Sequence, residues 1–86
     1  MSYTVVWKPS AESQLAHFWT SASDRPAITA AADEIDRLLR QNPLEQGESR
    51  SGKRRVLFVP PLAVFFEVHE QDRLVTVLRV ILLPEP

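Results

Sequence analysis

The chain has 86 residues, of which 44% are hydrophobic, and a formal net charge of −1 at pH 7. This length predicts a single domain, residues 1–86, with one two-layer core. The absence of cysteine excludes disulfides and thiol chemistry, and the balanced charge does not indicate a general nucleic-acid binder. No basic and apolar leader opens the sequence and no apolar run approaches the roughly 20 residues of a membrane span, so we expect a cytoplasmic protein without membrane contact.

The first half of the chain predicts a strand followed by two helices. Residues 2–7, SYTVVW, are β-branched and aromatic, as is typical of a strand, and the proline at position 9 suits the first turn of a helix over residues 10–22. Ser23 or Asp24 is the expected N-cap of a second helix that continues to Gln41. The short joint predicts that the two helices form an antiparallel hairpin.

The second predicted helix is amphipathic. Its apolar side chains recur at spacings of three and four residues, and they are Ile28, Ala31, Ala32, Ile35, Leu38 and Leu39. On its polar face, Asp33 precedes Arg37 by four residues and Asp36 precedes Arg40 by four, which predicts two ion pairs along the helix.

The second half predicts a polar loop and three strands. The loop covers residues 42–52, and the strands are Arg55–Val59, Leu62–His69 and Leu74–Leu83. Because the connections between these strands are short, we expect an antiparallel meander. Strict alternation would place one set of side chains against the helices, namely Leu62, Val64, Phe66, Val68, Leu74, Leu78 and Val80. It would place another set on the open face, namely Ala63, Phe65, Glu67, Val75, Val77, Arg79, Ile81 and Leu83.

Arg79 stands in the middle of the apolar run LVTVLRVILL. A charge in such a strand is costly unless it is paired or its face opens to a partner. Two interpretations remain open. Either Arg79 pairs with Glu67 on the neighbouring strand, or it is a binding residue on the open face. A cluster of four positive charges, Arg50, Lys53, Arg54 and Arg55, enters the meander and is a second candidate site.

Three stretches together resemble the RelE/ParE superfamily of toxins from type II toxin–antitoxin modules: YTVVWKPSAESQL, IDRLLRQNP and AVFFEVHEQDRLVTVLRV. The likeness covers nearly the whole chain. It implies an α+β fold of two layers in the order β-α-α-β-β-β, with a helical hairpin packed on a mainly antiparallel sheet. It also implies a sheet order of 1-4-3-2, with the first strand beside the last.

RelE-like members cut mRNA in the ribosome without a metal or other cofactor. The resemblance makes Lys53, Arg54 and Arg79 candidate catalytic residues, and it assigns phosphate or nucleic-acid binding to the basic cluster of Arg50, Lys53, Arg54 and Arg55. The chain departs from the nuclease pattern at three places. Ala63 replaces an arginine, Phe66 replaces a tyrosine, and neither tyrosine nor histidine follows Arg79.

These departures favour a ParE-like toxin, which poisons DNA gyrase by binding. A RelE-like ribosome-dependent endonuclease is the alternative, and a decayed family member that only binds a protein partner is a third. The family resemblance also implies a cognate antitoxin, which we expect to cover the apolar open face, namely Phe65, Val75, Val77, Ile81 and Leu83. Side chains from the loop or the termini, or a homodimer contact through the same face, are the competing explanations of that face.

Overall fold

One strand, two helices and a run of strands follow each other along the chain, in the order that the residue pattern predicts. A computed structural model describes residues 2–49 and 53–84. Its elements are β1 (Thr4–Trp7), α1 (Pro9–Ser21), α2 (Arg25–Gln41), the 3₁₀ helix η1 (Pro43–Glu45), β2 (Glu48–Ser49), β3 (Arg54–Val59), β4 (Leu62–His69) and β5 (Leu74–Leu82). No helix within the described ranges is both long and apolar enough to cross a membrane.

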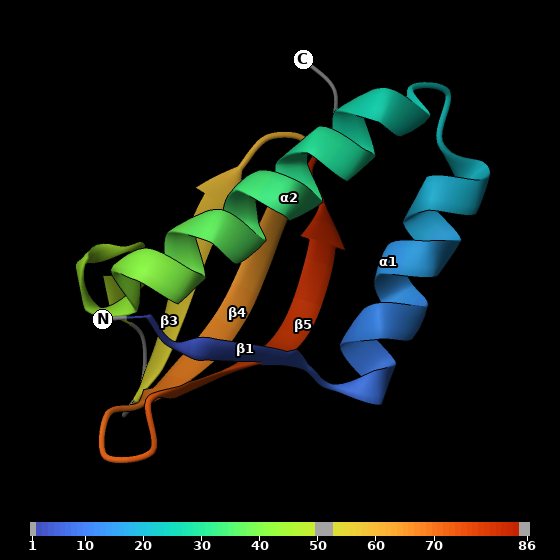
Figure 1. Ribbon diagram of the computed structural model, residues 1–86. Helices are drawn as coiled ribbons and strands as arrows, with labels where there is room; N and C mark the ends of the chain where they lie inside the picture. The colour runs from blue at the N-terminus through green and yellow to red at the C-terminus, as the bar shows by residue number, and fades with distance from the viewer. Residues whose placement is uncertain (1, 50–52, 85–86) are drawn as a thin grey trace.

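The strands form one sheet in the order β1-β5-β4-β3-β2 (Figure 1). β1 runs parallel to β5, with Thr4 opposite Leu74 and Trp7 opposite Val77. The other neighbours are antiparallel. Apart from the two-residue β2, this arrangement is the predicted order 1-4-3-2, so the α+β fold prediction is confirmed. β2 was not predicted, because it is a two-residue edge strand within a polar loop.

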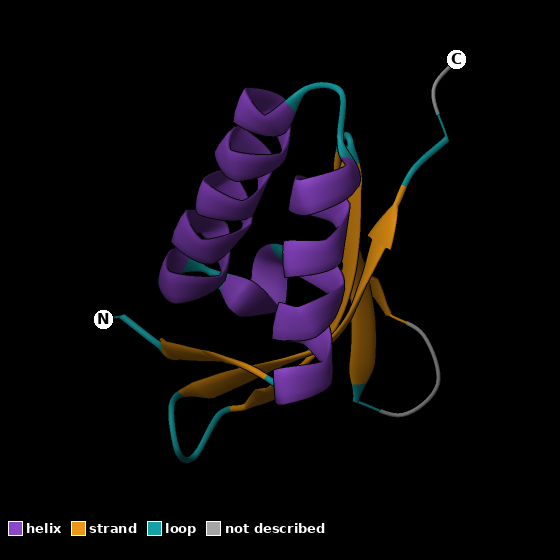
Figure 2. Cartoon of the chain, turned by 90° about the vertical axis from the view of Figure 1, so that its right-hand side faces the viewer, coloured by secondary structure: helices purple, strands orange, loops and turns teal. Residues whose placement is uncertain are grey.

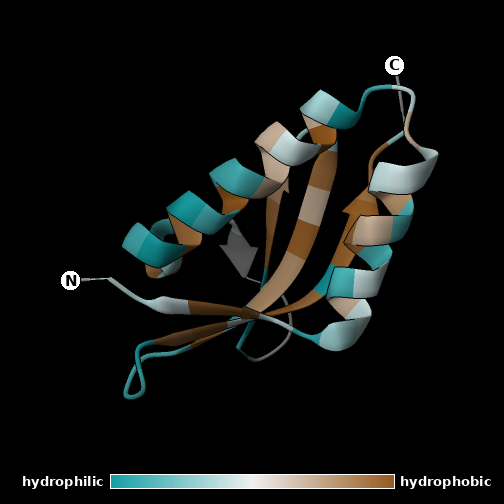
Figure 3. Cartoon of the chain, turned by 45° about the vertical axis from the view of Figure 1, so that its right-hand side comes forward, coloured by the Kyte–Doolittle hydropathy of each residue, from teal (hydrophilic) through white to brown (hydrophobic). Residues whose placement is uncertain are grey.

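Both helices cover the same face of the sheet (Figure 2). α1 packs against β5, whereas α2 lies over β3 and β4. The predicted apolar stripe of α2 is confirmed, and its hydrophobic side turns toward the sheet (Figure 3). Its fully or nearly buried members are Ile28, Ala31, Ile35 and Leu39. On the polar side, Arg40 Nε donates to Asp36 Oδ2 at 2.6 Å, as predicted.

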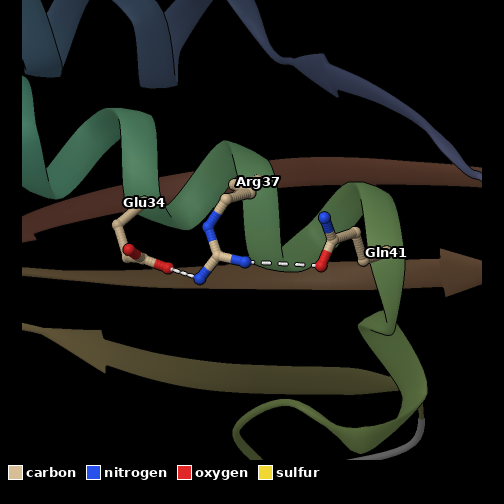
Figure 4. A network of polar contacts seen from close by, with 3 residues as sticks. All are labelled: Glu34, Arg37 and Gln41. Carbon is tan, nitrogen blue, oxygen red and sulfur yellow. Dashed lines mark hydrogen bonds and ion pairs between the residues drawn. The ribbon is translucent and has the colours of Figure 1, made fainter.

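The second ion pair predicted for α2 forms with a different partner. Arg37 donates to Glu34, three residues before it, and its second terminal nitrogen donates to Gln41 Oε1 at 3.3 Å (Figure 4). The predicted pair with Asp33 is therefore wrong. Residues three and four positions apart both lie within reach on a helix surface, so spacing alone did not decide between the two acids.

Asp24 caps the start of α2, where its Oδ1 accepts a hydrogen bond from the backbone N–H of Ala27 at 3.1 Å. We expect Asp24→Ala to lower the free energy of unfolding by about 1 kcal/mol, because that N–H loses its acceptor at the helix start. Ser23→Ala is the matched control, since Asp24 and not Ser23 is the N-cap. Urea unfolding of both variants measures the difference, and equal losses would contradict the assignment of the cap.

The helical hairpin is held at its joint by an aromatic and a basic side chain. Trp19 Nε1 donates to Thr29 Oγ1 at 3.1 Å, which links α1 to α2. The guanidinium of Arg25 stacks 4.7 Å from the Trp19 ring centroid and donates to the carbonyl oxygens of Trp19 and Thr20. These contacts satisfy carbonyls at the end of α1 that no helical N–H can reach.

β5 does not keep a single alternation along its length. Arg79 lies opposite Phe65 and Val77 lies opposite Phe66, which leaves Leu78 as an extra residue in β5. This is a β-bulge, and it moves the preceding side chains of the strand to the other face of the sheet.

The bulge overturns part of the predicted face assignment. Val75 and Val77 turn toward the helices and are 0% exposed, so their predicted place on the open face is wrong. Leu74 and Leu78 were predicted in the core but remain half-buried outside the main core cluster. Val80, beyond the bulge, is buried in the core as predicted.

Candidate functional site

Arg79 lies on the sheet face that the helices leave open. Its register partner Phe65 and the bulge residue Leu78 line a pocket with it, whereas the next residue, Val80, is buried in the helix-covered core. The Arg79 side chain is exposed, and no ion pair joins it to another described residue. It is therefore available to a ligand in solution.

Two more cations join Arg79 in this pocket, which we call the cation cleft: Lys8, Arg54, Phe65, Leu78 and Arg79. The cleft has a volume of about 260 Å³. Arg54 is the first residue of β3, and Lys8 lies between β1 and α1. Among the described residues, the lining holds three positive charges and no carboxylate, which favours an anionic ligand, and guanidinium groups match the oxygens of a phosphate or carboxylate.

Lys8 was missed by the sequence-based assignment. It reaches the cleft because β1 pairs in parallel with β5 and its backbone N–H donates to the carbonyl oxygen of Val77 at 3.0 Å. The two residues are far apart in the chain, and a lone lysine before a proline carries no functional signal of its own. Only the sheet pairing brings it beside Arg79.

The remaining predicted basic residues do not belong to the cation cleft. Lys53 and Arg55 line a different pocket of about 490 Å³, which also has His69, Glu70 and Asp72 in its wall. Arg55 Nε donates to the backbone oxygen of Gln46 at 3.0 Å, and the residue opposite Arg55 in β4 is the core residue Phe66. The single cluster predicted from the sequence is therefore split between the two faces, because neighbours in a strand point in opposite directions.

Arg50, the fourth member of the predicted cluster, lies outside the described residues.

The predicted pair of Arg79 with Glu67 does not form among the described residues. Glu67 lies opposite Arg54 on one side and Thr76 on the other, whereas Arg79 lies opposite Phe65. Glu67 Oε1 instead lies 4.0 Å from His69 Nε2. Arg79 and Glu67 are two positions out of register across the β4–β5 pair, and no ion pair joins them in the described part of the chain, so the interpretation of Arg79 as a partner of Glu67 is wrong.

The apolar open face is smaller than the sequence predicts. Phe65 and Ile81 remain half-buried on it, but Val75 and Val77 are in the core and cannot contact an antitoxin without unfolding. Leu83 lies just past β5, in a pocket of about 840 Å³ next to the joint of the helices. Phe58 extends the open face on β3, where its side chain is 52% exposed beside Ala63.

A second apolar hollow lies between the two helices, with a volume of about 530 Å³. Trp7, Leu15 and Trp19 contribute most of the large apolar side chains in its wall, and Glu12 and Asp33 add two carboxylates. Within the described ranges, no three His, Asp or Glu side chains gather in a way that could hold a metal ion.

The fold is that of the RelE/ParE toxins, although no family model matches the sequence and no curated protein is significantly similar to it. The toxin–antitoxin complex RelBE2 from Mycobacterium tuberculosis contains a chain with a TM-score of 0.76 and 16% identity, covering 95% of this chain and 92% of that one. A chain of the chromosomal ParDE system from P. aeruginosa gives a TM-score of 0.74 and 16% identity, covering 95% of this chain and 97% of that one. The isolated E. coli RelE toxin gives a TM-score of 0.70 and 11% identity, covering 98% of this chain and 87% of that one.

Proposed function

We propose that this protein is the toxin of a bacterial type II toxin–antitoxin module and that a cognate antitoxin neutralises it. The observation that carries this proposal is the RelE/ParE fold over nearly the whole chain, shared with structures that were solved as toxin–antitoxin complexes. The remaining open-face side chains, Phe65, Phe58 and Ile81, supply an apolar surface for the antitoxin beside the cation cleft.

Growth of a bacterium after induction of the full chain tests this role. We expect arrest, and we expect a short reading frame encoded beside the gene to relieve it when both are induced. Unchanged growth at a verified level of soluble protein would contradict the toxin role and would favour a protein that only binds a partner.

As the target we propose DNA gyrase, which the protein would poison by binding rather than by chemistry. The lining of the cation cleft supports this choice, because its described residues are three cations with Phe65 and Leu78, a set that suits binding of an anion and includes no histidine, tyrosine or carboxylate to transfer a proton. Phe66, at the position where the nuclease pattern has a tyrosine, is 0% exposed and belongs to the core. We place the contact with an anionic group of the gyrase–DNA complex at the cation cleft.

Purified gyrase, supercoiled DNA and the purified protein provide the direct test. We expect cleaved DNA to accumulate as the protein is added, and unperturbed supercoiling at stoichiometric protein would reject gyrase as the target.

The convergence of Lys8, Arg54 and Arg79 on one cleft favours a second candidate, a ribosome-dependent mRNA endonuclease. Cations can hold a scissile phosphate and stabilise the charge that develops on it. Such a reaction also needs a group that accepts the proton of the 2′-hydroxyl, for which Glu67, opposite Arg54, is the candidate, and a proton donor for the leaving 5′-oxygen, which water would supply. A reconstituted translation mix shows whether mRNA is cut at the ribosomal A site, and intact mRNA at stoichiometric protein would exclude this function.

A further inference from the structure

The bulge in β5 decides which side chains enter the cation cleft. With Leu78 as the extra residue, Leu78 and Arg79 both line the cleft, while Val77 and Val80 on either side of them are both in the core. In a regular strand, neighbouring residues would point to opposite faces. The placement of Arg79 in the cleft therefore depends on the bulge keeping this conformation.

The backbone on either side of the bulge is held by the segment that begins at Lys8. The N–H of Lys8 donates to the carbonyl oxygen of Val77 at 3.0 Å. On the other side, the side-chain oxygen Oε1 of Gln14 accepts a hydrogen bond from the N–H of Val80 at 2.9 Å. These two contacts bracket Leu78 and Arg79 from the outer edge of β5.

Gln14 supplies the hydrogen-bond acceptor for the Val80 N–H that a neighbouring strand would otherwise supply. β1 pairs with β5 only over Leu74–Val77, so β1 offers no backbone acceptor beside Val80. A polar backbone group that is removed from water without a partner is costly, and a side chain from α1 meets this need. Gln14 is half-buried, and its contact spans 66 positions of sequence.

We propose that Gln14 is a positioning residue for Arg79. Its side-chain oxygen holds the Val80 N–H and thereby fixes the bulge that turns Arg79 into the cation cleft beside Lys8. α1 thus controls the geometry of the anion site on the opposite side of the sheet. The expected effect of Gln14 on anion binding rests on the proposed function of the cleft. The expected effect of Gln14 on the conformation of the bulge does not.

Two substitutions in the full chain separate this role from simple packing. Gln14→Met keeps the length of the side chain but lacks the oxygen acceptor, and Gln14→Glu keeps an oxygen acceptor. We expect the amide of Val80 to exchange with solvent about tenfold faster in the Met variant, as loss of one hydrogen bond predicts, and close to its original rate in the Glu variant. Ser13→Met, at an exposed neighbouring position on α1, is the control.

The same proteins are titrated with inorganic phosphate while the Nε–Hε signal of Arg79 is followed by NMR. We expect phosphate to shift this signal in the unaltered protein and in Ser13→Met, and to bind severalfold more weakly in Gln14→Met. Unchanged Val80 exchange in Gln14→Met would overturn the inference. A second outcome would also overturn it: Gln14→Met lowers the global stability, Val80 exchange rises only by the amount that this loss of stability explains, and phosphate binding is unchanged. Gln14 would then act in packing alone.

This experiment is independent of the toxin assay. A wild-type protein that does not arrest growth contradicts the proposed function, yet leaves the link between Gln14 and the bulge measurable. Conversely, phosphate that does not move the Arg79 signal in the unaltered protein rejects the cleft as an anion site, and with it the positioning role, whether or not growth is arrested.

Discussion

Arg79→Ala should abolish growth arrest while changing the free energy of unfolding by no more than about 0.5 kcal/mol. The side chain is exposed, and among the described residues no carboxylate pairs with it, so the fold loses little when it is removed. The cation cleft, in contrast, loses one of the three charges and one of the two guanidinium groups that its described residues supply. Growth after induction and urea unfolding of the purified variant measure the two effects separately.

Arg37→Ala is the matched control for this prediction. Arg37 is also an exposed arginine, but it lies on α2, on the other side of the sheet, where it bonds to Glu34 and Gln41. We expect this variant to arrest growth as the unaltered protein does and to lose no more than about 0.5 kcal/mol, as is usual for an exposed ion pair. Full arrest by Arg79→Ala, at equal protein level, would contradict the role of the cleft.

The largest loss of stability should come from Phe66→Ala. Phe66 is 0% exposed on the helix-covered face of β4, and its removal leaves a cavity that the surrounding core can only partly fill. We expect the free energy of unfolding to fall by about 3–5 kcal/mol, which is a large share of the total stability of a domain this small. Urea unfolding followed by circular dichroism measures the change.

Phe58→Ala tests whether burial causes that loss. Phe58 has the same side chain on the neighbouring strand, but it is 52% exposed on the open face. We expect a loss of less than about 1 kcal/mol, because only part of the ring is removed from water in the folded protein. If both variants lost the same free energy, the assignment of Phe66 to the core and Phe58 to the open face would be wrong.

The cation cleft could be predicted only in part. Arg54 and Arg79 were identified from the sequence, and the structure brings them together. Lys53 was expected beside them but lines another pocket, since adjacent residues entering a strand point to opposite sides. Lys8 carries no local signal, because its place beside Arg79 depends on a parallel pairing between strands from opposite ends of the chain.

The sequence by itself determined the elements of this protein and their broad arrangement. Apolar periodicity located both helices and the three long strands, and short connections between the strands required an antiparallel meander. These features follow from the spacing of apolar residues and the length of the connections, both of which are local properties of the sequence. The resemblance to the RelE/ParE family added the position of β1 beside β5, which no local pattern contains.

Only the tertiary structure decided which face several β5 side chains occupy. A bulge of one residue at Leu78 reverses the alternation, and it therefore buries Val75 and Val77 on the helix-covered face while Arg79 lies on the open face. No residue type at that position marks the bulge in the sequence. It depends on two hydrogen bonds at β5, one donated by the Lys8 N–H and one accepted by the Gln14 side chain, and such long-range contacts exist only once the helix and the sheet have come together.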